Sequence, residues 1–277
     1  MLKYIENKEA EEKIAGMNAE QVLSKIAEIK DPVTNMAVGE MISNLKAVVQ
    51  NEKKNVVVSL SNGDIDQMLA CLYQDNAQGV MQGAEVLAKM LGAEKIVLIL
   101  PESLKEQETE KDFTCHANDK KGCPTEILYG MCSRMSYTTD LLVHPITCVK
   151  CFEALKGENI HKTILSVNGQ APQEVEYGTT LAQIIPEAKA VRIGNRIWGA
   201  EVRTQTLDEA FPIENGVVET YEEDVCIVKE VEAFVGKLRE KCCGKCVFCR
   251  EGLVQIHEGL KDLTAGKAKL TDIELMK

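Results

Sequence analysis

The sequence predicts an α/β protein in which a strand-helix-strand unit comes first, a small β-rich module follows and helices end the chain. Two short apolar runs, NVVVSL (55–60) and KIVLIL (95–100), are typical of strands buried on both faces. A helical segment that ends at Gly92 separates them. A dense group of cysteines beside the last helical segment carries the strongest chemical signal.

Amphipathic helices are predicted before the first strand. The apolar period of a helix occurs in KEAEEKIAG (8–16), NAEQVLSKIAEI (18–29) and MAVGEMISNLKAVVQ (36–50). Asn18 is placed to accept a backbone N–H in the first turn of the second helix. The first strand therefore follows a helical N-terminal region.

The turn after the first strand is a candidate binding site. Asn62, Gly63 and Asp64 follow NVVVSL almost directly. Ligands of open α/β sheets bind at the carboxyl ends of the strands. A plain turn is the favoured interpretation of these residues, and a ligand site is the alternative.

Four segments of the chain differ in their patterns. Residues 1–125 are predicted to form the α/β domain, which closes in a charged, aperiodic loop over 102–125. Connecting helices are expected over 126–160. Residues 161–215 are expected to form the β-rich module, and residues 216–277 a helical domain.

Within the β-rich module, two strands are predicted around a turn at Asn168 and Gly169, with a helix after them. Further strands are plausible at KAVRIG (189–194) and RIWGAEV (196–202). The helical period returns over 223–240 and runs into the cysteines.

Charge and composition exclude several classes of function. A net charge of −11 argues against nucleic acid or anionic lipid as a partner. No apolar run approaches the roughly 18 residues of a membrane span, and the acidic start lacks a signal-peptide pattern. We therefore expect a cytoplasmic protein without direct membrane insertion. Its 11 cysteines then suggest thiolates held for metal or redox work.

The leading candidate metal site is CCGKCVFCREG (242–252), in which Cys243, Cys246 and Cys249 are each separated by two residues. Such a loop can wrap three thiolates round a 4Fe–4S cubane and leave one iron to a distant ligand. Arg250 and Lys245 would offset the negative charge, as would backbone N–H groups at the start of the next helix.

Three alternatives to an iron–sulfur centre are less favoured. Zinc usually takes two separated C-x2-C pairs rather than one compact triplet. A patch of thiols without metal would give no packing advantage over Ala or Val. Disulfide or thiol-exchange chemistry conflicts with the expected compartment.

The stretch DVCIVKEVEAFVGKLREKCCGKCVFCREG (224–252) resembles the C-terminal iron–sulfur domain of the NADH-binding flavoprotein subunit of bacterial complex I, and its kin in soluble hydrogenases and formate dehydrogenases. The resemblance implies that Cys243, Cys246 and Cys249 are the first three cluster ligands. Cys242 stands where the family usually has serine, so we expect it to be a bystander that does not bind the cluster.

The resemblance also implies a fourth ligand well beyond the third cysteine, past a helical stretch. This sequence stops at Lys277 before such a position, so we expect the helical domain over 216–277 to be incomplete. A truncated sequence, another residue, water or a partner chain are the possible explanations. Cys226 matches a family cysteine outside the ligand set and is expected to be a helical thiol.

Two upstream segments extend the resemblance. Residues 163–185 look like the β-grasp module that precedes the cluster domain in this family, of the soluble-ligand-binding (SLBB) type. Residues 55–67 and 80–102 resemble the core of its Rossmann-like flavin domain. The family's glycine-rich flavin loop is replaced here by VTNMAVGEMISNLKAVV (33–49), in which only Gly39 remains. This departure argues against FMN and NAD binding, and leaves Asn62, Gly63 and Asp64 as a flavin-site remnant.

The resemblance therefore implies an electron-transfer subunit of a larger NADH-linked oxidoreductase, with an iron–sulfur protein or ferredoxin-like subunit as partner. No catalytic residue is assigned in this chain. The alternatives are an active NADH dehydrogenase flavoprotein with a divergent FMN site, and a β-grasp binding or scaffold module without a cluster.

Other cysteine and histidine groups have ordinary explanations. His144, Cys148 and Cys151 could suggest a metal site, but the segment is better explained as an apolar helix face. Cys115, His116 and Cys123 lie in a polar loop without a fourth ligand nearby, so we do not expect a metal site there. Trp198 is a single aromatic residue in the β-rich module and is expected to pack in its core.

Overall fold

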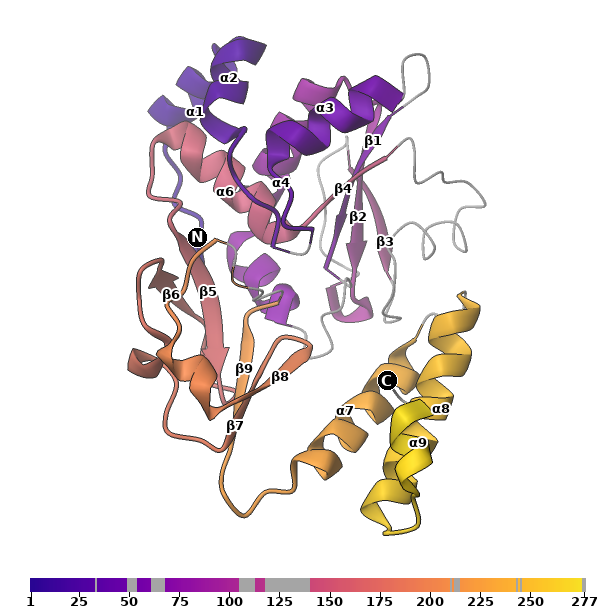
Figure 1. The fold of residues 1–277 in the computed structure, drawn as a ribbon. Helices are drawn as coiled ribbons and strands as arrows, with labels where there is room; N and C mark the ends of the chain where they lie inside the picture. The colour runs from indigo at the N-terminus through magenta and orange to yellow at the C-terminus, as the bar shows by residue number, and fades with distance from the viewer. Residues whose placement is uncertain are drawn as a thin grey trace.

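The computed structural model describes residues 1–32, 34–48, 54–60, 68–104, 113–117, 140–209, 211, 215–242, 244 and 246–275. Three regions follow one another along the chain (Figure 1). A parallel sheet with its helices comes first, a mixed sheet comes second, and a pair of long helices with a short third helix comes last.

The first sheet is parallel throughout its described strands, in the order β3-β2-β1-β4. These are β1 (Asn55–Ser59), β2 (Lys95–Leu100), β3 (Phe113–Ala117) and β4 (Asp140–Val143). Both predicted strands are confirmed as β1 and β2, which pair in register from Asn55 and Lys95 onward. The chain reverses its direction of winding between β1 and β4, so the carboxyl ends of these two strands border the place where such sheets bind ligands.

Helices surround this sheet, and the first three of them confirm the predicted N-terminal helices. They are α1 (Lys8–Ala15), α2 (Ala19–Ile26), α3 (Val38–Val48), α4 (Met68–Leu91), the 3₁₀ turn η1 (Glu102–Leu104) and α6 (Pro145–Lys156). Asn18 caps α2 as predicted, and accepts a hydrogen bond from the Gln21 backbone N–H at 2.9 Å. Helix α4 ends at Leu91, directly before the predicted stop at Gly92, and kinks at Asn76.

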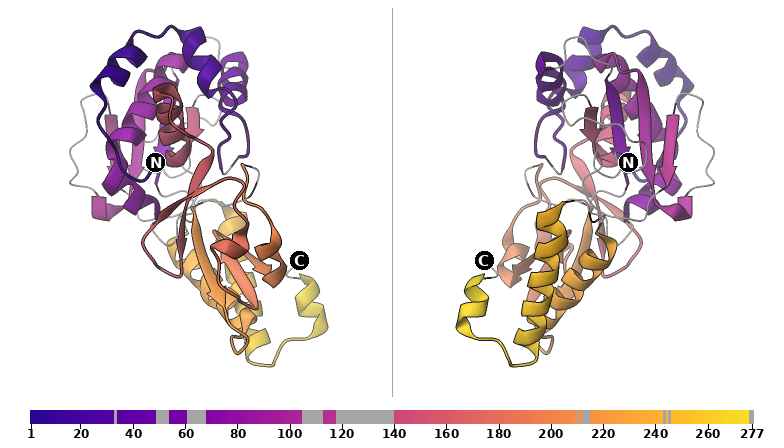
Figure 2. Two further views of the ribbon diagram at one scale, coloured as in Figure 1. Left: turned by 90° about the vertical axis from the view of Figure 1, so that its left-hand side faces the viewer. Right: turned by 90° about the vertical axis from the view of Figure 1, so that its right-hand side faces the viewer.

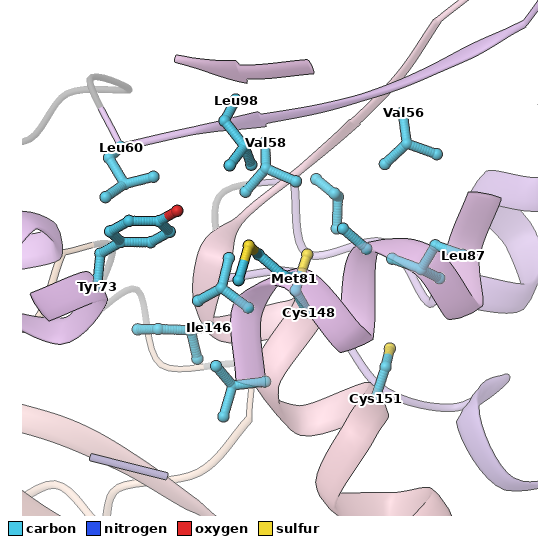
Figure 3. Close-up of a cluster of buried hydrophobic side chains, with 14 of the residues drawn as sticks. Val56, Val58, Leu60, Tyr73, Met81, Leu87, Leu98, Ile146, Cys148 and Cys151 are labelled. Atoms are coloured by element: carbon cyan, nitrogen blue, oxygen red, sulfur yellow. The ribbon is translucent and has the colours of Figure 1, made fainter. Parts of the chain in front are cut away.

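The core of the first region lies between this sheet and helices α4 and α6 (Figure 3). Val56, Val58 and Leu98 are fully buried there. Helices α4 and α6 pack so closely that a Cβ added at Gly83 would stand 1.9 Å from the carbonyl oxygen of Cys148. Gly83 therefore permits the helix contact on which the core depends.

Two strands of the first sheet differ from the sequence prediction. Residues 113–117 form β3 on the edge beside β2, within the segment 102–125 for which the pattern predicts a loop. Residues 140–143 form β4 and pair with β1, and α6 packs on α4, within the segment 126–160 for which the pattern predicts only connecting helices. Both strands are short and follow polar stretches, so their pattern alone is weak.

The second sheet is mixed, in the order β6-β5-β9-β7-β8. Its strands are β5 (Lys162–Val167), β6 (Gln173–Glu176), β7 (Ala190–Ile193), β8 (Arg196–Gly199) and β9 (Val217–Tyr221). The 3₁₀ turns η2 (Leu181–Gln183) and η3 (Ala200–Thr204) flank it.

Four of these strands fall where the sequence predicts them. The predicted turn at Asn168 and Gly169 is confirmed, since both residues have positive φ, 50° and 71°. The helix predicted after the first two strands is the single turn η2 instead. The sequence pattern does not predict β9, yet this strand lies at the centre of the sheet, parallel to β5 and antiparallel to β7.

The last region consists of α7 (Ile227–Lys241), α8 (Val247–Thr264) and α9 (Leu270–Leu275). Helices α7 and α8 pack side by side (Figure 2). The guanidinium of buried Arg192 on β7 lies 4.8 Å above the ring of Phe234 on α7, and pairs with Glu219 on β9 at 3.0 Å. These contacts of Arg192 hold α7 against the mixed sheet. Among the described helices, none has both the length and the apolar character needed to cross a membrane.

Candidate metal centre

The cysteine loop lies between the two long helices. Cys242 is the residue after α7, Cys246 is the residue before α8, and Cys249 lies in the first turn of α8. Cys243 and Lys245, two residues of the predicted site, lie outside the described residues. Gly244 has a positive φ of 74°, which allows the chain to reverse between the helices.

Two sulfur atoms come into contact at this loop. The Sγ atoms of Cys242 and Cys249 are 3.3 Å apart, and the Gly244 N–H donates to the Cys242 Sγ at 3.4 Å. The Arg250 guanidinium donates to the Gly244 carbonyl oxygen at 3.3 Å. Cys242, a bystander in the sequence prediction, therefore lies against a predicted ligand. Its presence in CCGKC is visible in the sequence, but the register of the two helices is not.

The surroundings of the loop combine a helix N-terminus with two ion-paired arginines. The N-terminus of α8 brings the positive end of its dipole and its first backbone N–H groups to Cys246 and Cys249. A hollow of about 300 Å³ beside the loop is lined by Arg239, Arg250 and Glu240. Arg239 pairs with Glu258 at 3.2 Å and Arg250 with Glu251 at 2.8 Å, so the helix N-terminus is the part of these surroundings that favours a thiolate.

The donor set of the loop fits a thiolate-bound iron–sulfur group. Cys246 and Cys249 are exposed at the start of α8, so that their sulfurs are accessible to incoming iron. Within the described ranges, no three His, Cys, Asp or Glu side chains converge on one metal position, and Cys243 lies outside those ranges. Soft sulfur ligands at this spacing suit iron–sulfur clusters.

The segment that replaces a glycine-rich phosphate loop forms helix α3. Gly39 donates its backbone N–H to the Ala27 carbonyl oxygen at 2.9 Å. A Cβ on Gly39 would stand 3.0 Å from the Cβ of Ala27. This glycine serves helix packing, and the described residues of the segment do not present the row of backbone N–H groups that a phosphate requires.

A carboxylate occupies the N-terminus of α6, beside the end of β4. Asp31 is 2% exposed, and its Oδ2 accepts hydrogen bonds from the His144 backbone N–H at 2.9 Å and the Thr147 hydroxyl at 3.0 Å. Helix N-termini are ready anion sites, and here the chain supplies its own anion. Asn62, Gly63 and Asp64, the predicted flavin-site remnant, lie outside the described residues.

The minor candidates are mostly structural residues. Cys148 and Cys151 are fully buried in the core, where burial raises the pKa of both thiols (Figure 3). Burial lowers the pKa of His144 to about 4, and its Nδ1 accepts the Ile146 backbone N–H at 3.2 Å. Trp198 stacks on Phe211 with ring centroids 6.1 Å apart. These contacts explain the residues without a metal or a cofactor.

The remaining candidates divide between described and undescribed residues. Cys115 and His116 belong to β3, whereas Cys123 lies outside the described residues. Cys226 is exposed at the start of α7, away from the cysteine loop in the chain.

Residues 229–277 match the family model for the NADH-ubiquinone oxidoreductase-F iron-sulfur binding region. An NADH-quinone oxidoreductase subunit of Streptomyces coelicolor is 27% identical over 140 residues, which cover 44% of this chain and 31% of the relative. The HndC subunit of the NADP-reducing hydrogenase of Solidesulfovibrio fructosivorans is 26% identical over 146 residues, or 49% of this chain and 27% of the relative. The matches therefore span about a third of the length of these curated relatives.

A solved structure of an NAD+-reducing NiFe-hydrogenase in its H2-reduced state resembles the fold, with a TM-score of 0.69 and 16% identity. The similarity covers 94% of this chain and 56% of that chain. At this identity the likeness establishes the α/β fold alone.

Proposed function

The chain is related, over part of its length, to the NADH-binding flavoprotein subunits of bacterial complex I and similar hydrogenases, and on that premise we propose an iron–sulfur electron-transfer subunit. It would serve a multi-subunit NADH-linked oxidoreductase, with an iron–sulfur or ferredoxin-like subunit as its electron partner. Cys243, Cys246 and Cys249 would hold a 4Fe–4S cluster.

One observation carries this proposal. Cys246 and Cys249 stand at the N-terminus of α8, inside the segment that matches the iron–sulfur region. A cluster bound there supplies one-electron redox chemistry. The chain's own residues would hold it by thiolates, and the helix dipole would favour the added negative charge.

The proposal leaves FMN and NADH chemistry to partner chains. Helix α3 and the packing role of Gly39 support this part, because a bound flavin phosphate needs backbone N–H groups free to approach it. The Asp31 carboxylate at the start of α6 supports it too, since a second anion there would meet repulsion. A β-grasp role for the mixed sheet rests on the sequence resemblance.

The test is anaerobic reconstitution of the chain with iron and sulfide, followed by iron and sulfide analysis and extraction of flavin. We expect iron and sulfide in equal amounts and no flavin. Cys246→Ser and Cys249→Ser should lose the iron, because serine is a poor ligand for these clusters. Cys226→Ser is the matched control, an exposed cysteine in the same region that should keep full iron content.

Two outcomes would replace the proposal. Yellow protein that reduces a dye with NADH would identify an active flavoprotein with a divergent FMN site. A chain that binds no iron under any reducing condition would leave a binding or scaffold module.

A further inference from the structure

The contact between Cys242 and Cys249 has no role in the cluster just proposed. We propose that these two cysteines form a dithiol–disulfide site in the cluster-free chain, which a small-molecule disulfide of the glutathione type oxidises. Its effect on cluster loading rests on the proposed function, whereas the disulfide itself does not.

The geometry brings the two thiols together. Their Sγ atoms are 3.3 Å apart, and a disulfide bond requires them to close to about 2.0 Å. Cys242 directly follows one helix and Cys249 lies in the first turn of the next, so the packing of α7 on α8 holds both backbones. Between them, Gly244 has a positive φ, and its carbonyl oxygen accepts a hydrogen bond from Arg250.

Accessibility decides the order of the chemistry. Cys249 is exposed and Cys242 is half-buried, so that an incoming disulfide meets Cys249 first. The Cys249 thiolate attacks one sulfur of the small disulfide, forms a mixed disulfide and releases one thiol. The Cys242 thiolate then attacks the Cys249 Sγ, forms the intramolecular bond and releases the second thiol. The chain loses two electrons and two protons, and the small disulfide gains both.

Oxidation at this site removes a cluster ligand. A bridged Cys249 sulfur cannot bind iron as a thiolate, so that cluster loading would require prior reduction of the chain. Intracellular disulfides are usually transient and redox-sensing, which fits a bond between partly exposed sulfurs.

The experiment treats the full cluster-free chain with glutathione disulfide and maps the bond by mass spectrometry. Trypsin separates residues 242–245 from 246–250. A Cys243→Ser, Cys246→Ser double variant leaves one cysteine on each peptide, so a cross-linked pair identifies the bond between Cys242 and Cys249. Loss of two hydrogens and a cross-linked pair are expected. An absent pair would overturn the proposal.

Iron loading provides the second readout. Glutathione disulfide should reduce iron uptake by the otherwise unchanged chain to background, and dithiothreitol should restore it. Added to the double variant, Cys242→Ser should leave glutathione bound to Cys249, because no second thiol of the loop remains to resolve the mixed disulfide. A mixed disulfide populated equally with and without Cys242 would contradict the site. If the fully reduced chain takes up no iron, the proposed cluster fails, and the mapped disulfide is judged separately.

Discussion

The parallel-sheet region and the helical region stabilise themselves in different ways. The first fills the space between its sheet and helices with aliphatic side chains that are fully buried, such as Val58, Leu87 and Leu98. In the described parts of α7, α8 and α9, only Val235 and Leu260 are buried. We therefore expect the helical region to depend on its contacts with the mixed sheet and on the cluster proposed at its cysteine loop.

The exposed side chains of the helical region support this difference. Val228, Val247, Ile273 and especially Leu270, at 85% exposed, face outward. A partner subunit would cover such side chains, whereas Ile5, at 71% exposed, is the one large apolar side chain so exposed among the described residues of the first region. The comparison suggests that loss of the cluster would loosen one region and spare the other.

The largest expected effect is the response of the helices to the cluster. Removing it should raise amide hydrogen exchange in α8 and the end of α7 strongly, while β1 and β2 keep their protection. Metal binding to structural sites supplies on the order of 10 kcal/mol, far more than the buried side chains of this region. Exchange measured on loaded and cluster-free chains checks it. Equal protection in both forms would remove the contrast.

The close contact between α4 and α6 should make the stability of the first region sensitive to a single added methyl group. Gly83→Ala would press a Cβ against the Cys148 carbonyl oxygen, now 1.9 Å from the ideal Cβ position, and should cost about 3 kcal/mol or more. Gly252→Ala is the control in α8, where no atom lies within 4 Å, and should stabilise that helix by up to about 1 kcal/mol. Urea unfolding of both variants measures these changes. Equal effects would refute the helix-contact argument.

Acid should weaken the first region through His144. Burial lowers the pKa of this imidazole from 6.5 to about 4, helped by Lys150 and opposed by Asp31. Between these pH values the unfolded chain binds a proton that the folded chain does not, so the free energy of unfolding should fall by about 3 kcal/mol as pH drops. Above pH 6.5 the contribution is fully present. Urea titrations from neutral pH down to the folded-state pKa follow it.

His144→Gln is the matched variant for this measurement. It removes the titrating group, and the slope of stability against pH should flatten over that window. A slope unchanged by the substitution would assign the acid sensitivity to other groups.

The smallest expected effect concerns the link between the regions. Arg192→Met keeps the apolar stem but loses the ion pair with Glu219 and the charge over Phe234, at a cost of about 2 kcal/mol. Burial raises the pKa of Glu219, but the hydrogen bond and charge of Arg192 outweigh it and keep that pKa below its usual value. Faster exchange in α7, with β1 unchanged, is the expected readout. An effect on β1 equal to that on α7 would contradict a local link.

Sequence patterns predict the elements whose residues carry their own signal. KIVLIL forms β2 with the predicted bounds, and Asn18 forms the predicted cap, because apolar runs and capping residues act locally. Strand β9 and edge strand β3 escape such prediction because their pairing comes from distant strands. Short strands of this kind are selected by tertiary contacts.

The site divides in the same way. The spacing of Cys243, Cys246 and Cys249 is readable from the sequence, as is the helix that begins beside them. The contact of Cys242 with Cys249 could not be predicted, because it depends on the register between α7 and α8. Nor could the sequence show that Asp31 would reach the start of α6, since 113 residues separate it from His144.

Metal analysis of the anaerobically purified chain, combined with EPR after dithionite reduction, tests the central claim most directly. The account predicts iron with acid-labile sulfide and an EPR signal of a reduced cluster, both lost in Cys246→Ser and kept in Cys226→Ser. Zinc in place of iron, or an EPR-silent chain without sulfide, would contradict it.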